Sequence, residues 1–344
     1  MPGAEREAVA GRLRWQAAEC RRLGSELYGE LLGLAADDVD AGGAAWEVLR
    51  DQREERSFSA LPLRLMGAVN RLVLAGVEVE AFAGWEAFRD VLARRRDELR
   101  ELVDLPVQTN EVGRSAALLF GFLAVAARWE LPLRTLELGA SAGLNSNWDR
   151  YRYETEGFAW GPAGSSLRLV DWRLSSHIGD FRANYAEAVE VASREGCDAA
   201  PVDASTEEGR RTLLAYVWVD QRRRVERLTA ALEVAMAHPV AVEQARAAAW
   251  AAERLAEPAE GFATVVFHSV FQWYLPEDER AALDATIAAA GERASADAPL
   301  AWLRLEGPGE LAELRLTTWP GGEERLLGRA GYHGNPVELL ESPA

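Results

Sequence analysis

The spacing of apolar residues divides the chain into two parts with different secondary structure. From residue 4 to about 103 apolar residues recur three and four positions apart, as in the stretch 61–73, and this period places them on one face of an α-helix. Glycines interrupt the pattern at 40–43 and 75–76, where helices are expected to end. We therefore expect four or five helices in this part.

After residue 106 short apolar runs alternate with helical stretches, which is typical of βαβ units and a mostly parallel sheet. The expected strands are 134–138, 167–172, 198–202, 263–268 and 299–305. The expected helices are 113–129, 143–150, 206–217, 220–237, 241–256 and 277–290. Residues 311–340 predict an antiparallel hairpin that closes the sheet, with its turn at 320–322. We expect a helical N-terminal domain, 1–105, and a Rossmann-like α/β domain, 106–344.

Composition narrows the possible partners and compartment. The 344-residue chain has a formal charge of −17, so its field would repel a polyanion, and nucleic acid is not an expected partner. Cys20 and Cys197 are far apart and signal neither a disulfide framework nor a metal site. The first residues lack a signal-peptide pattern, and the longest apolar stretch, 115–127, is shorter than the ~20 residues that span a bilayer. We expect a cytoplasmic protein without a membrane partner, while its oligomeric state stays open.

The segment 135–145, Thr-Leu-Glu-Leu-Gly-Ala-Ser-Ala-Gly-Leu-Asn, predicts a ligand-binding turn between the first strand and the first helix. Glycines there allow the backbone to approach a ligand, toward which amide donors and the positive helix end point. The dinucleotide motif G-x-G-x-x-G fails at Ser141 and Leu144. The E/D-x-G-x-G-x-G turn common in S-adenosylmethionine (SAM) sites matches at Glu137, Gly139 and Gly143, with Ser141 in place of the middle glycine.

The same five residues, 139–143, also spell G-x-S-x-G, the nucleophile elbow of α/β-hydrolases, in which Ser141 would be the nucleophile. The possible acid and base partners follow in the required order and are Asp203, Asp220, His268 and His333. About 130 mostly helical residues precede the turn, whereas the hydrolase elbow follows several strands. The SAM interpretation is therefore favoured, and the hydrolase and a purely structural turn remain alternatives.

Several segments together resemble a known family. They are residues 107–115 (Val-Gln-Thr-Asn-Glu-Val-Gly-Arg-Ser), 136–145, 201–203, 265–269 and 306–309. They are similar to a bacterial family of uncharacterised proteins, a domain of unknown function that is generally assigned a class I SAM-dependent methyltransferase-like fold. Residues 264–280 also look like the fourth strand of SAM methyltransferases and the loop and helix after it. The resemblance implies a fold and SAM as the cofactor, but no particular reaction.

A SAM site needs partners for an amino-acid end, a ribose diol and an adenine. Glu137 is expected near the ammonium, Arg114 at the carboxylate and Asp171, at the end of the predicted second strand, at the diol. The residues expected to contact the cofactor are Glu111, Arg114, Glu137, Gly139, Ala140, Ser141, Gly143, Asn145, Asp171 and Asp203. Each of the polar ones also has an ordinary explanation as a helix cap or strand-end carboxylate.

The expected reaction is SAM-dependent methyl transfer to a small molecule. His268, at the end of the fourth strand, is the candidate base, although it is equally a buried histidine with its hydrogen bonds satisfied. Asn110, Trp273 and Tyr274 are expected to contact the acceptor, with the helical domain acting as a lid. Trp148, Tyr151 and Tyr153 either cover the cofactor or belong to the core. A SAM-binding protein without turnover is a further alternative.

Overall fold

The computed structural model describes residues 2–52, 60–170, 172–174 and 188–340. The chain forms two compact units. The first unit comprises Met1–Thr109 and Ser205–Glu226, and the second comprises Asn110–Ala204 and Arg227–Ala344. The helical unit thus includes Ser205–Glu226, a segment from the middle of the chain. The sequence prediction, which separates the domains at residue 105, assigns this segment to the α/β domain.

All the regular secondary structure described in the first unit is helical, as the apolar spacing predicts. Its helices are α1 (Pro2–Arg22), α2 (Glu26–Asp40), α3 (Ala44–Leu49), α4 (Ala60–Leu74), α5 (Trp85–Arg94), α6 (Arg96–Val103) and α8 (Glu207–Ala215). Asn70 on α4 attaches the inserted segment, because its side-chain amide donates to the carbonyl oxygens of Ala215 (3.1 Å) and Leu214 (3.3 Å). Gly67 on the same helix leaves room for the ring of Tyr216.

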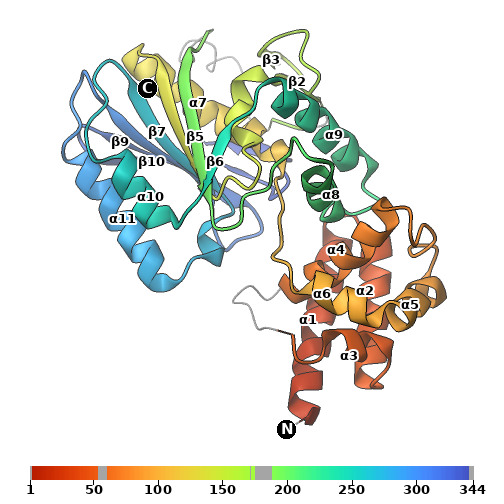
Figure 1. The fold of residues 1–344 in the computed structure, drawn as a ribbon. Helices are drawn as coiled ribbons and strands as arrows, with labels where there is room; N and C mark the ends of the chain where they lie inside the picture. Colours follow the sequence, from red (N-terminus) through yellow and green to blue (C-terminus); the bar gives the residue numbers. More distant parts are fainter. Residues whose placement is uncertain (1, 53–59, 171, 175–187, 341–344) are drawn as a thin grey trace. The chain divides into compact units, whose positions relative to one another are not determined.

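The second unit contains an eight-stranded sheet in the order β11-β10-β9-β8-β7-β1-β5-β6 (Figure 1). Its strands are β1 (Leu133–Leu138), β5 (Val191–Asp198), β6 (Ala241–Gln244), β7 (Ala263–Ser269), β8 (Leu300–Glu306), β9 (Ala312–Trp319), β10 (Glu323–Ala330) and β11 (Val337–Leu339). The five strands from β6 to β8 are parallel, and β9, β10 and β11 continue the sheet antiparallel. Along the chain the parallel strands are numbered third, second, first, fourth and fifth, so their order reverses between β1 and β7.

The second and third strands of the parallel sheet differ from the sequence prediction. The predicted strand 167–172 includes only β4 (Arg168–Leu169), which lies in a separate small sheet with β2 (Arg152–Thr155) and β3 (Phe158–Trp160). The second strand is instead β5, and the third is β6, at the start of a predicted helix. Half of their residues are polar; on β5, for example, Arg194 and Glu195 form ion pairs with Asp149 and Arg254. A strand whose side chains form ion pairs lacks the apolar run on which the prediction depends.

Helices cover both faces of the sheet. Trp302 on β8 belongs to the same buried cluster as Leu283 and Ile287 of α11 (Glu277–Gly291), together with residues of α10 (Ala247–Arg254). The next residue, Leu303, lies against Gly121 of α7 (Ser115–Trp129). Because successive strand residues point to opposite faces, α7 covers the other side of the sheet (Figure 1).

One helical stretch among the described residues, Val112–Trp129, is long and apolar enough to cross a membrane, but 78% of it is buried inside the fold. Its side chains, such as Leu119 and Phe122, are fully buried. An apolar helix that is buried to this extent is a core helix packed on the sheet. The remaining elements are α9 (Arg222–Ala237), which runs across the division between the units, and three 3₁₀ helices, η1 (Val112–Arg114), η2 (Asn145–Arg150) and η4 (Gln272–Tyr274).

Candidate functional site

The glycine turn follows β1 directly, as predicted, and holds three residues in the left-handed backbone region. Their φ angles are +66° at Gly139, +53° at Ser141 and +69° at Gly143. Glycine adopts this region without a steric penalty, whereas a residue with a side chain costs about 1–3 kcal/mol there. Ser141 therefore stores strain at the tip of the turn, and the surrounding contacts must maintain it.

Asn110 supports the turn from the chain segment just before α7. Its side-chain amide donates to the carbonyl oxygen of Ala140 at 3.2 Å, and its side-chain oxygen accepts from the backbone N–H of Leu144 at 3.0 Å. Both polar ends of this buried side chain are thus used by the turn. Asn110, which is expected at the methyl acceptor, thus holds the backbone of the turn in place.

Asp198 ends β5 beside the turn and was missed by the sequence prediction. Its carboxylate accepts from the backbone N–H of Ser141 and from that of Ala200, both at 2.9 Å. The loop after it also donates from the N–H of Val202 to the carbonyl oxygen of Ser141 at 3.0 Å. The sequence prediction places a carboxylate at the end of the strand next to β1. It assigns that strand to residues 167–172, whereas the strand is β5, which ends at Asp198.

Two other aspartates, Asp171 and Asp203, are expected at the carboxyl ends of the strands. Asp171 lies outside the described residues. Asp203 is exposed in the loop that follows β5, and the cap of α8 is Thr206, whose side-chain oxygen accepts from the N–H of Gly209 at 2.9 Å. Asp198 is therefore the carboxylate of the second strand that touches the turn.

Glu137 lies below the turn on β1 in a buried polar group. The side chain is 3% exposed, and its Oε2 accepts from the Ser146 hydroxyl at 2.6 Å. Burial raises the pKa of Glu137 from 4.5 to about 8, against the opposing effect of the Ser146 hydrogen bonds. Next to it, Ser115 donates to the Asn145 side-chain oxygen at 2.7 Å. Glu137 is thus predominantly protonated at neutral pH.

The segment 110–114 is tied to the C-terminal loop of the same unit. Arg114 donates to the carbonyl oxygens of Tyr332 (2.9 Å) and Ser269 (3.1 Å) and thereby bridges this loop to the end of β7. Glu111 accepts from the N–H of Gly113 at 3.0 Å and forms an ion pair with Arg227 at 3.1 Å. Glu111 therefore caps η1, while Arg114 lies near Glu137, whose pKa it lowers.

His268 is fully buried on β7 with both ring nitrogens engaged. The indole N–H of Trp302 donates to its Nε2 at 3.2 Å, so the ring proton is on Nδ1, which donates to Glu306 Oε1 at 2.8 Å. The imidazole has 0% exposure. This arrangement leaves neither nitrogen open to a methyl acceptor or to Ser141, so His268 has the structural role that was the alternative to a base.

The predicted aromatic residues fall into two groups. Trp273 and Tyr274 lie on η4 just beyond β7 and are each 45% exposed, with the Trp273 ring 5.5 Å from that of Tyr332. Trp148 is buried and stacks on Phe122 with 4.2 Å between ring centroids. Tyr151 and Tyr153 are likewise fully buried. The first group is exposed, and the second belongs to the core.

Phe271 connects the end of β7 to the glycine turn. A Cβ placed on Gly139 would be 2.2 Å from the Phe271 Cδ2 atom, so the ring lies directly against the glycine. Val270, just before it, has φ +51°, which is uncommon for a β-branched residue. The structure therefore brings together, at the carboxyl ends of β1, β5, β7 and β8, the glycine turn, Asp198 and the aromatic segment after β7.

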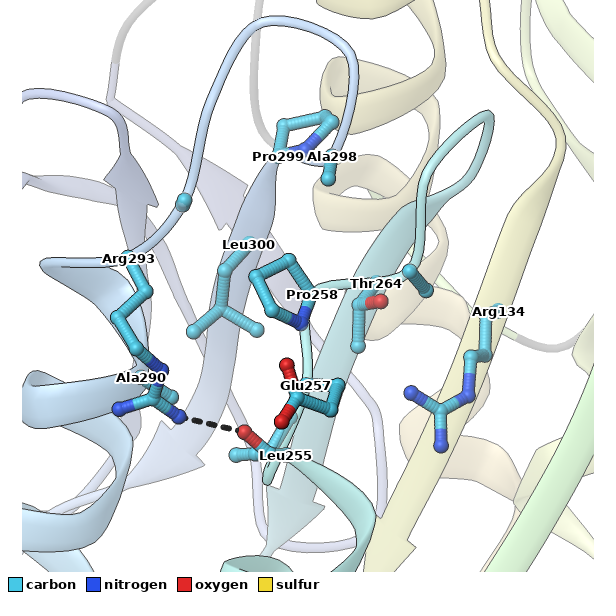
Figure 2. A pocket seen from close by; sticks show the side chains of 12 residues that line it. Arg134, Leu255, Glu257, Pro258, Thr264, Ala290, Arg293, Ala298, Pro299 and Leu300 are labelled. Atoms are coloured by element: carbon cyan, nitrogen blue, oxygen red, sulfur yellow. Dashed lines mark hydrogen bonds between the residues drawn. The ribbon is translucent and has the colours of Figure 1, made fainter.

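A small cleft lies at the other end of the parallel strands, where β1, β7 and β8 begin (Figure 2). It is lined by Arg134, Thr264 and Leu300 and by Arg293, which donates to the carbonyl oxygen of Leu255 at 2.6 Å. Its volume is about 20 Å³, room for a water molecule but not for a nucleoside. Within the described ranges no group of three metal-ligating side chains is found. The glycine turn, Asp198 and Phe271 lie instead at the carboxyl ends of the strands.

Fold and site together define a mixed α/β protein with a strained glycine turn at the carboxyl end of an interior strand of a mostly parallel sheet. The chain belongs to a family of uncharacterized proteins conserved in bacteria (DUF2332), which it matches over residues 10–339. This confirms the family that the sequence motifs resemble. No match was found among curated proteins or solved structures.

Proposed function

We propose that this protein binds SAM at the carboxyl ends of β1 and β5 and transfers its methyl group to a small molecule. The observation that carries the proposal is the position of the glycine turn. The five parallel strands follow the 3-2-1-4-5 order of Rossmann-like sheets, and ligands of such sheets bind where the strand order reverses. The turn after β1 lies at this reversal, between β5 and β7.

The residues around the turn suit the parts of SAM. The turn from Gly139 to Gly143 has the glycine spacing of a SAM-binding turn, and the space beside its two glycines is taken by Phe271 and by Val240 and Val242. Asp198 uses two of the roughly four acceptor positions of a carboxylate for the amides of Ser141 and Ala200. The other positions suit the two hydroxyls of a ribose. Arg114, near Glu137, suits the carboxylate of the amino-acid end.

When bound, SAM supplies an electrophilic methyl group on a sulfonium. The contribution of this chain is to hold the two reactants aligned and to exclude water, which are sufficient tasks for a displacement of this kind. The exposed aromatic residues Trp273 and Tyr274 lie beyond β7, where an acceptor would approach. His268 offers no free base at this point, since its ring nitrogens are committed to Trp302 and Glu306.

Calorimetric titration with SAM and S-adenosylhomocysteine tests the proposal. We expect both to bind the wild type and Asp198→Asn to bind them about 10 to 100 times more weakly, because a hydrogen bond to a charged group contributes about 1.5–3 kcal/mol. Glu253→Gln, an exposed carboxylate on α10, is the matched control and should bind as the wild type does. A folded wild type that gives no heat with either compound would overturn the proposal.

A serine hydrolase is the second candidate, because Ser141 combines the G-x-S-x-G sequence with φ +53°, a strained geometry of the kind found at a nucleophile elbow. Against it, Ser141 is buried and His268 is committed elsewhere. A fluorophosphonate probe should therefore leave the wild type unlabelled. Labelling that disappears in Ser141→Ala would favour the hydrolase over methyl transfer.

A further inference from the structure

Glu306 is a buried carboxylate with one oxygen fully used and the other unused. It ends β8, and its Oε1 accepts from His268 Nδ1 at 2.8 Å, from the N–H of Phe271 at 2.8 Å and from that of Gln272 at 3.4 Å. Its Oε2 is buried and has no hydrogen-bond partner among the described residues. The residue is 9% exposed. An unpaired buried acceptor costs about 1–3 kcal/mol, and more when it is charged.

The hydrogen-bond partners of Glu306 include no arginine within the described chain. They are His268, whose Nε2 accepts from Trp302, and two backbone amides. No arginine of the described segments forms an ion pair with it, although other buried carboxylates such as Glu111 have one. A buried carboxylate ordinarily requires a cation close by. The structure therefore provides an acceptor that is suited to a cationic donor from outside.

The surroundings of Glu306 place it at the candidate site. Phe271 donates its N–H to Glu306 and lays its ring against Gly139 of the turn. The next residues form η4, which buries none of its three side chains and presents Trp273 at 45% exposure. Aromatic faces attract cations, and the net charge of −17 favours their approach.

We infer that Glu306 recognises the substrate of this site and that this substrate is a small organic ammonium carrying N–H donors. An N–H of the ligand donates to Oε2, and the body of the ligand contacts Trp273. The ligand reaches Oε2 by displacing the surface turn η4. The inference deepens the proposed function, on which it rests for the identity of the neighbouring ligand, by naming the class of methyl acceptor as primary or secondary amines. The bound ammonium gives one N–H proton to Oε2, and the neutral nitrogen then forms its bond to the methyl carbon as the C–S bond of SAM breaks and S-adenosylhomocysteine leaves.

Benzylamine is a suitable probe, titrated by calorimetry and ligand-observed NMR into the wild type saturated with S-adenosylhomocysteine. We expect it to bind, while benzyl alcohol, which lacks the charge, and benzyltrimethylammonium, which lacks the N–H donors, bind at least tenfold more weakly. Glu306→Gln keeps the acceptor for His268 and Phe271 but replaces Oε2 by a donor, and it should weaken benzylamine at least tenfold with S-adenosylhomocysteine affinity unchanged. Trp273→Ala, at an exposed position, should weaken benzylamine as well.

The outcomes separate this inference from the proposed function. Equal binding of benzylamine to wild type and Glu306→Gln, or no benzylamine binding to a wild type that binds S-adenosylhomocysteine, overturns the inference and leaves the SAM site standing. Benzylamine binding that depends on Glu306 in a protein that does not bind S-adenosylhomocysteine supports the ammonium site and overturns the proposed cofactor. If Glu306→Gln does not fold, loss of binding in Trp273→Ala supports the site and unchanged binding overturns it.

Discussion

Replacing Gly334 by alanine is expected to lower the free energy of unfolding by about 3–5 kcal/mol. Gly334 has φ +82°, and a Cβ there would lie 1.9 Å from the carbonyl oxygen of Gly113. Because that neighbour is backbone, it cannot rotate away as a side chain would. The contact joins the C-terminal loop to the segment 110–114 that supports the glycine turn, so we also expect weaker binding of S-adenosylhomocysteine.

Gly261→Ala is the matched control for this substitution. Gly261 has the same φ of +82°, but nothing lies within 4 Å of a Cβ built there. It should cost only the backbone term of about 1–2 kcal/mol. Urea denaturation of the two variants measures the difference, which isolates the close approach of the two chain segments. Equal losses of stability in the two variants would show that the loop does not depend on this approach.

The sequence predicted the elements whose pattern is local. The strands β7 and β8 are mostly apolar and buried on both faces, and α7 is an apolar stretch of helical length, so each is predicted close to its observed bounds. The strand β1 is half polar, and the glycine turn that follows it marks its end. The strand β5 was missed because its side chains form ion pairs, which are visible only after folding. The helical segment 205–226 joins the first unit through contacts with α4, more than a hundred residues earlier in the chain.

The candidate site shows the same limit. The motif around Gly139 identified the turn, because glycine spacing is a property of neighbouring residues. The roles of Asn110, His268 and Glu306 depend on partners about 30 or more residues away in the chain. Those pairings decide that Asn110 supports the turn and that His268 orients a carboxylate. The type and position of a residue in the sequence can suggest that it lies at the site. What the residue does there depends on its hydrogen-bond partners, which only the fold brings together.

The pH dependence of stability is expected to change strongly in Glu137→Gln. The pKa of Glu137 is raised from 4.5 to about 8 by burial. Below pH 4.5 the carboxyl group is protonated in both states. Between pH 4.5 and about 8 the unfolded chain releases this proton while the folded chain retains it, so the stability of the wild type falls as pH rises, by about 4–5 kcal/mol in total. The glutamine variant has no such loss.

Unfolding free energies measured from pH 5 to 9 test this expectation. Glu137→Gln should gain on the wild type from pH 5 to about 8, and the difference should then level off. Ser146→Ala is the companion variant: it removes the hydroxyl that donates to Glu137 at 2.6 Å and favours the ionised form, so the levelling should move to higher pH. A difference that stays constant from pH 5 to 8 would contradict the raised pKa.

The same group links stability to ligand binding. An ammonium placed beside Glu137 favours its ionised form, so binding of S-adenosylhomocysteine at pH 7 should release a proton and tighten as pH rises toward 8. Calorimetric heats measured in buffers of different ionisation enthalpy report this proton. Glu137→Gln, which has none to release at this position, is the control, since its heats should no longer carry this contribution. Binding by the wild type without proton release would place the ammonium away from Glu137, and Arg114 and Asp198 would then remain as the charged groups that orient the ligand on the turn.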